Sequence, residues 1–159
     1  MSRRVVLPAV LCAAALAACS APDPYSASAG APSQLSEPDR TILVANSTAR
    51  LGTVVIDGLG WTLYRYDNDS PKPSTSTCTD SCATEWPPVL MQPGTPEYDG
   101  VDPKNVGTLT RDDGSNQVTI GGWPVYRHAA DPKPGSVDGQ GADGGWWAIT
   151  PTGGRATQP

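Results

Sequence analysis

The chain has 159 residues and a formal net charge of −5, and its 17 Gly and 17 Pro far exceed the usual ~12% share of the two combined. Charged residues make up only 17%, Phe is absent, and five Trp and five Tyr supply the aromatic side chains. This composition excludes a coiled coil, a helical bundle, a multi-pass membrane protein and a basic protein that binds nucleic acid. It predicts one small domain that is rich in turns.

Residues 1–18 have the pattern of an export signal. Arg3 and Arg4 precede an apolar run from Val5 to Ala18. The run is shorter than the ~20 apolar residues that span a membrane, and no stop-transfer pattern follows it, so a cleaved signal peptide is favoured over a transmembrane helix. The arginine pair leaves both general secretion and twin-arginine export open, because ordinary signals also carry two arginines by chance.

The end of this signal carries a more specific pattern. Leu16-Ala17-Ala18-Cys19 resembles the lipobox of bacterial lipoproteins, in which cleavage precedes the cysteine and its thiol is acylated. The alternative is an ordinary signal peptide with a cysteine by chance. With Cys19 as the lipidation site, we expect an exported protein anchored by its lipid to the outer face of the bacterial cell membrane. The membrane is then an expected partner through this anchor, no nucleic acid is expected, and the sequence does not assign an envelope ligand or protein partner.

Residues 19–40 form a second region, rich in Ser, Ala and Pro and without any hydrophobic period. Such a segment cannot bury enough apolar surface to offset its ordering entropy. We therefore predict a disordered tether between the lipid and the folded part.

From residue 41 onward the composition changes to short apolar runs separated by Asp-Gly and Gly-Gly turn signals. No stretch shows an apolar helical stripe over three turns, and only a short helical turn around Cys82 to Glu85 is expected. Residues 41–159 are therefore predicted to form a small antiparallel, all-β domain. The expected strands are Ile42–Val44, Thr53–Ile56, Thr62–Tyr66, Gln117–Ile120, Pro124–Tyr126 and Trp146–Ile149.

An internal repeat divides this domain at a nearly constant offset. Tyr64 recurs as Tyr126 and Asp69 as Asp131 at one spacing, and a slightly shorter spacing relates Lys72 to Lys133 and Trp86 to Trp147. We predict two pseudo-symmetric hairpin repeats, at about residues 50–100 and 106–154, which pack together because neither half can bury its apolar face alone.

Two cysteines remain in the domain once Cys12 is cleaved off and Cys19 is lipidated. Cys78 and Cys82 are separated by three residues, and outside the cytoplasm such a pair predicts a disulfide.

Taken together, these motifs resemble the bacterial secreted-repeat lipoproteins, a family with a repeated Tyr-x4-Asp motif and no established function. The first motif, Tyr64 to Asp69, has the strict form, whereas the second departs from it because His128 occupies the aromatic position. Further matches are Cys78, Cys82, Trp86-Pro87-Pro88, Lys133-Pro134-Gly135 and Trp146-Trp147. The resemblance implies envelope localisation and a repeated β fold, and it implies no reaction.

The motif side chains have two interpretations. In one, each aspartate lies past a strand end and caps a turn, as at Asp69 before Pro71. In the other, the two motifs form a pseudo-symmetric binding surface for a small ligand, a glycan or a cation. The candidate residues of that surface are Tyr64, Tyr66, Asp69, Lys72, Tyr126, His128, Asp131, Lys133 and Trp147.

The sequence favours a non-enzymatic binding or interaction module that needs no cofactor. Asp69 and Asp131 could supply the two carboxylates of a glycosidase, but turn acids are common and nothing else marks them. The alternative is a copper-, haem- or redox-linked lipoprotein that uses Cys78, Cys82 and His128, since two thiolates and an imidazole suit Cu(I). That ligand set resembles copper-delivery proteins, whose thioredoxin-like architecture this sequence lacks.

Overall fold

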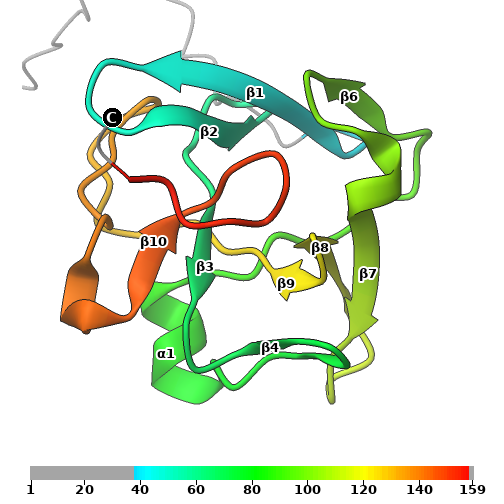
Figure 1. Ribbon diagram of the computed structural model, residues 1–159. Coiled ribbons are helices and arrows are strands. Elements are labelled where there is room, and N and C mark those ends of the chain that lie inside the picture. Colours follow the sequence, from blue (N-terminus) through cyan, green and yellow to red (C-terminus); the bar gives the residue numbers. More distant parts are fainter. Residues whose placement is uncertain (1–37, 158–159) are drawn as a thin grey trace, which may run out of the picture. The chain divides into compact units, whose positions relative to one another are not determined.

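Short strands joined by tight turns make up most of the regular structure in residues 38–157, the part of the chain that this computed structural model describes (Figure 1). The predicted signal peptide, Cys19 and nearly all of the tether lie outside the described residues. The strands are β1 (Ile42–Thr48), β2 (Gly52–Asp57), β3 (Tyr64–Tyr66), β4 (Ser70–Pro71), β5 (Ser74–Thr75), β6 (Glu97–Asp99), β7 (Val106–Thr110), β8 (Asn116–Ile120), β9 (Trp123–Pro124) and β10 (Trp146–Ala148). The helices are α1 (Asp80–Glu85) and the 3-10 turns η1 (Pro103–Asn105) and η2 (Ala142–Gly144).

The strands pair into small sheets that are almost entirely antiparallel. The orders are β2-β1-β6, β7-β8-β9, β10-β3 and β4-β5. The prediction of an all-β domain is confirmed, and the expected helical turn is present as α1. One pairing differs from the prediction, because β6 runs parallel to β1, with Leu43 opposite Tyr98.

In the first repeat, the hairpin is completed by a segment from the second repeat. Leu63 donates its N–H to the carbonyl of Val55 at 2.9 Å, which closes the hairpin. Ile149, from the second repeat, then bonds to both strands: its carbonyl accepts from Val55 N at 2.9 Å, and its N–H donates to Leu63 O at 2.9 Å.

The second repeat has the same arrangement with the roles exchanged. Val125 donates its N–H to the carbonyl of Val118 at 3.1 Å. Val89, from the first repeat, then bonds to both strands: its carbonyl accepts from Val118 N at 2.8 Å, and its N–H donates to Val125 O at 3.0 Å. Each repeat therefore supplies a segment that hydrogen-bonds to the hairpin of the other.

The two repeats meet at a pair of residues at the centre of this exchange. Tyr64 and Tyr126 donate their backbone N–H groups to each other's carbonyl oxygens, both at 2.9 Å. Because the two residues are equivalent in the repeat, a pseudo-two-fold axis passes between them.

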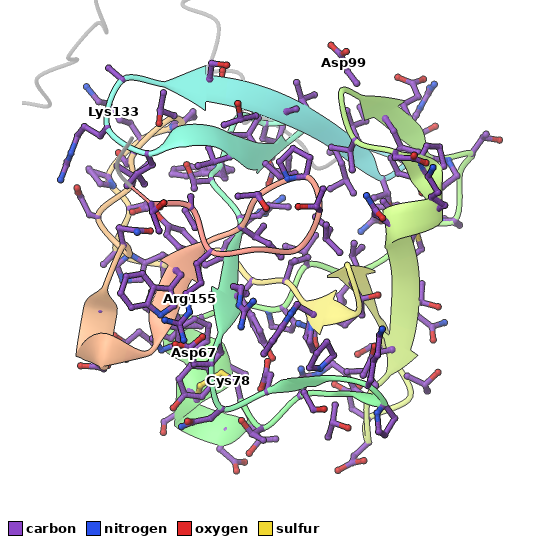
Figure 2. The ribbon with its side chains drawn as sticks, in the orientation of Figure 1. Asp67, Cys78, Asp99, Lys133 and Arg155 are labelled. Atoms are coloured by element: carbon purple, nitrogen blue, oxygen red, sulfur yellow. A yellow bond between two sulfur atoms is a disulfide. The ribbon has the colours of Figure 1, made fainter. Side chains whose placement is uncertain are left out.

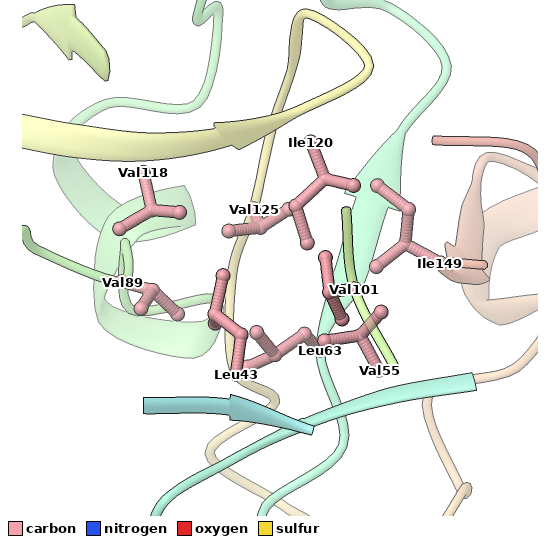
Figure 3. Packing of buried hydrophobic residues seen from close by; sticks show 9 residues of the cluster. All are labelled: Leu43, Val55, Leu63, Val89, Val101, Val118, Ile120, Val125 and Ile149. Carbon is pink, nitrogen blue, oxygen red and sulfur yellow. The ribbon is translucent and has the colours of Figure 1, made fainter. Parts of the chain in front are cut away.

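The apolar core is built from both repeats, as Figure 3 shows. Each repeat supplies aliphatic side chains from its hairpin and one from its last segment, so each half covers apolar surface of the other. The buried members of this cluster are Leu43, Val55, Leu63, Val89, Val101, Val118, Ile120, Val125 and Ile149.

Candidate functional site: the tyrosine–aspartate pairs and the aromatic column

The tyrosine of each motif is hydrogen-bonded to the aspartate of the other motif. Tyr64 donates its hydroxyl to Asp131 Oδ2 at 2.8 Å, and Tyr126 donates to Asp69 Oδ2 at 2.6 Å. Both tyrosines are completely buried, and each aspartate is only 6% exposed. The repeated motif thus forms two reciprocal bonds across the boundary between the repeats.

The second oxygen of each aspartate bonds to its own repeat. Asp69 Oδ1 accepts from Thr77 N at 2.7 Å and from Thr77 Oγ1 at 2.9 Å, and Asp131 Oδ1 accepts from Asp138 N at 3.1 Å. The interpretation of these acids as backbone acceptors agrees with this geometry. The segment that Asp69 fixes is the one at Thr77, however, rather than the turn into Pro71.

Burial determines the ionisation of these groups. Removal from water raises the pKa of both phenols, Tyr64 and Tyr126, far above the ordinary value of 10.0, and the neighbouring carboxylates raise it further. Burial also raises the pKa of Asp69, against the lowering effect of hydrogen bonds from Tyr126 and Thr77. The tyrosines are held neutral, as hydrogen-bond donors.

Four rings from the two repeats form a continuous parallel stack, which we call the aromatic column. Trp86 and Trp146 lie at its centre, with centroids 3.9 Å apart and planes 3° apart. Tyr66 stacks on Trp146 at 4.3 Å, and His128 stacks on Trp86 at 4.1 Å. Tyr66 and His128 are equivalent positions of the two motifs, so the column follows the same pseudo-two-fold axis.

The two motif tyrosines abut this column edge-on. Tyr64 lies 5.5 Å from Trp86, and Tyr126 lies 5.2 Å from Trp146, measured between ring centroids. The structural counterpart of Trp86 is therefore Trp146, and not Trp147 as the repeat offset suggested. Trp146 is 2% exposed.

Trp147 lies in a different environment, at the partly exposed face of β10. Its ring nitrogen donates to Asp67 Oδ2 at 2.7 Å, and the Arg155 guanidinium lies 5.0 Å from its ring centroid. Asp67 also forms an ion pair with Arg155 at 2.7 Å (Figure 2). A second ion pair joins Asp67 to Arg65 at 3.2 Å. Asp67 was not predicted from the sequence, where its only signal is its position one residue after the strand that carries the motif.

The predicted disulfide is present between Cys78 and Cys82, and it ties the segment before α1 to the first turn of that helix. Cys78 is completely buried against the cluster that contains Trp86. His128, the third proposed copper ligand, instead stacks on Trp86, with its Nδ1 3.3 Å from Asp131 Oδ1. Within residues 38–157 no group of three or more His, Cys, Asp or Glu side chains is placed to hold a metal ion. The geometry does not support the copper alternative.

The two candidate lysines lie apart from these buried groups. Lys72 and Lys133 are both exposed, and Figure 2 shows Lys133 extending away from the domain. The structure therefore divides the nine candidates into three groups. Tyr64, Asp69, Tyr126, His128 and Asp131 join in one network, Tyr66 and Trp147 lie at its partly exposed margin, and the lysines lie outside it.

The repeat also identifies the family of this chain. The sequence pattern of a family described as a secreted repeat of unknown function matches residues 46–90 and 107–150, together more than half of the chain. The chain belongs to this secreted-repeat family. The ends of the two matched segments have the same separation as Trp86 and Trp146, which agrees with the pairing of these two residues in the structure.

Membership of the secreted-repeat family confirms the resemblance that the motifs indicated and implies export. No curated protein and no solved structure matches the chain. No helix within residues 38–157 is long and apolar enough to span a membrane.

Proposed function

We propose that this secreted-repeat protein is a lipoprotein, anchored through acylated Cys19 to the outer face of the bacterial cell membrane, and that its repeat domain is a binding or interaction module without catalytic activity. Export is supported by the family. Lipid anchoring is supported by the pattern Leu16-Ala17-Ala18-Cys19 at the end of an apolar run.

One observation carries the non-enzymatic part of this proposal. Asp69 and Asp131 are the paired carboxylates that could have served as acid and base, and both are buried and engaged across the repeats. A catalytic acid or base must reach the proton that it transfers. These two carboxylates reach a tyrosine hydroxyl of the partner repeat instead.

The anchoring is tested by fractionating cells that express the chain with Cys19→Ser, with Cys12→Ser as the matched control in the same apolar run. We expect Cys19→Ser to move the protein from the membrane to the soluble exported fraction, and Cys12→Ser to leave it membrane-bound. Continued membrane association of Cys19→Ser would show that no lipid on this residue holds the protein.

The binding role is tested with the soluble Cys19→Ser protein and isolated cell envelopes from which lipid has been extracted. We expect the protein to co-sediment with the envelopes without releasing soluble sugars or peptides. Release of such products, abolished by Asp131→Asn in a variant that remains folded, would instead show an enzyme.

A further inference from the structure

Neighbouring rings of the aromatic column lie closer together than the centroid distances that aromatic pairs usually favour. Aromatic pairs in proteins favour offset or edge-on contacts with centroids about 4.5–7 Å apart over a face-to-face sandwich. The three consecutive contacts of the column are at 3.9, 4.1 and 4.3 Å, all with nearly parallel planes. Such contact allows the π electrons of neighbouring rings to overlap along the whole stack.

The column also has, at its sides, two groups that are suited to losing an electron together with a proton. Oxidation makes a phenol strongly acidic, so it proceeds readily only where a base can take the proton. Tyr64 and Tyr126 each have such a base in place, in the carboxylates of Asp131 and Asp69 at 2.8 and 2.6 Å. Each of these phenols touches a tryptophan of the column, at 5.5 and 5.2 Å between centroids.

From this arrangement we infer that the domain has a further activity: the aromatic column carries oxidising equivalents from one-electron oxidants at the surface to the buried Tyr64–Asp131 and Tyr126–Asp69 pairs. The oxidants are of the class of small inorganic or oxygen-centred radicals. The inference goes beyond the binding role and does not depend on the lipid anchor.

The ends of the column provide the route from the surface. Tyr66 is partly exposed, and the side chain of His128 at the opposite end is 10% exposed, whereas Trp86 and Trp146 between them are 1% and 2% exposed. An oxidant in the surrounding solvent can therefore contact the ends of the stack but not its centre.

The oxidation of Tyr64 takes place in two steps, and a third step restores the residue. An oxidant at one end of the column takes one electron, through the end ring, from the stacked indoles of Trp86 and Trp146, which leaves an indole radical cation and the reduced oxidant. Tyr64 then donates one electron to the indole radical cation and passes its phenolic proton to the Asp131 carboxylate. This leaves neutral indoles and a neutral tyrosyl radical beside a protonated Asp131. A one-electron reductant of the thiol or quinol class restores Tyr64, which recovers its proton from Asp131.

The experiment is pulse radiolysis of the purified full chain with the azide radical, which oxidises tryptophan first. The decay of the indolyl absorption and the growth of the phenoxyl absorption are then followed. We expect a first-order growth of phenoxyl radical at a rate independent of protein concentration. That growth should be lost in the Tyr64→Phe/Tyr126→Phe variant and unchanged in Tyr98→Phe, the matched control outside the column.

A second pair of variants tests the role of the carboxylate in a protein that keeps one tyrosine–aspartate pair. Tyr126→Phe should retain the growth through Tyr64 alone, and adding Asp131→Asn should slow it by about 10²-fold, the lower end of what a positioned proton acceptor contributes. Circular dichroism of the aromatic rings verifies that each variant is folded. Phenoxyl growth at the same rate in the double tyrosine variant, or only concentration-dependent decay of the indolyl radical in the unaltered protein, would overturn the inference.

Discussion

At the scale of single residues, the tyrosine and the aspartate of the motif form hydrogen bonds that cross between the repeats. Tyr64 and Asp131 are 67 residues apart in sequence, yet their side chains meet as donor and acceptor in the core. One copy of the motif alone would bury a carboxylate without its phenolic donor, and an unsatisfied buried acceptor destabilises a fold more than a formed hydrogen bond stabilises it.

Tyr64→Phe isolates this contribution, because it removes the hydroxyl and keeps the ring against Trp86. We expect the free energy of unfolding, measured by urea denaturation, to fall by about 1–3 kcal/mol, the cost of leaving a buried acceptor without a partner. The control is Tyr98→Phe, a partly buried phenol outside the pairs, with an expected change within about 0.5 kcal/mol. Equal losses in the two variants would contradict a structural role for the Tyr64–Asp131 bond.

The two buried phenols also predict a loss of stability in alkali. The pKa of Tyr64 and of Tyr126 is raised in the folded domain, whereas the unfolded chain ionises both near the ordinary pKa of 10.0. Their stabilisation is therefore complete below about pH 10 and is lost as the pH rises toward the folded pKa, by about 1.4 kcal/mol per pH unit for each tyrosine. Unfolding free energies measured at increasing alkaline pH check this slope. A profile just as steep in Tyr64→Phe/Tyr126→Phe would assign the loss to other groups.

At the scale of elements, the two repeats hold equivalent turns by different means. The residues that donate a backbone N–H to the motif aspartates, Thr77 and Asp138, are followed by Cys78 in one repeat and by Gly139 in the other. Gly139 leaves no space for a larger residue, since a Cβ there would lie 2.8 Å from atoms of both Tyr64 and Trp86. The first repeat has space for a cysteine at the equivalent position, Cys78, and the disulfide of Cys78 with Cys82 ties this segment to α1.

Removing the disulfide should therefore weaken α1 without unfolding the domain. For Cys78→Ala/Cys82→Ala we expect a loss of about 2 kcal/mol, the chain-entropy value for so short a loop. The stack of Trp86 on Trp146 should persist, and aromatic circular dichroism measured beside thermal unfolding will report it. The unaltered protein after reduction is the matched control. A loss of the aromatic signal would show that the disulfide, rather than the stack, positions Trp86.

The elements that the sequence predicted are those with a local signal. The hairpin from Val54 to Tyr66 and the strand at Gln117–Ile120 have β-branched runs beside glycine turns, and the structure contains both. The strand β7 and the parallel β6 were missed, because both are mostly exposed edge strands with few apolar residues to set a period of two.

At the scale of the whole molecule, the sequence revealed the repeat but not the exchange between its copies. The constant offset shows that Tyr64 and Tyr126 are equivalent, yet it cannot show which copy supplies the partner of each. The choice depends on which segment hydrogen-bonds to each hairpin, and in the structure Ile149 bonds to the first and Val89 to the second. The tyrosine–aspartate bonds and the aromatic column follow from that choice, so neither could be predicted from the sequence.

Because each repeat completes the other, the two halves should remain together after the chain between them is cut. Pro93 and Thr95 are exposed in the connection between Leu90 and β6. A protease site inserted there should be cleaved in the folded protein, and the two fragments should then co-elute in size-exclusion chromatography and separate only in denaturant. Cleavage also turns folding into an association, so the unfolding midpoint of the cut protein should rise with its concentration, whereas that of the uncut protein should not.

Tyr64→Phe/Tyr126→Phe in the cut form is the matched variant, and its fragments should dissociate at a lower denaturant concentration. Separation of the unaltered fragments in native buffer would show that the exchanged strands and reciprocal bonds do not hold the repeats together without a continuous chain.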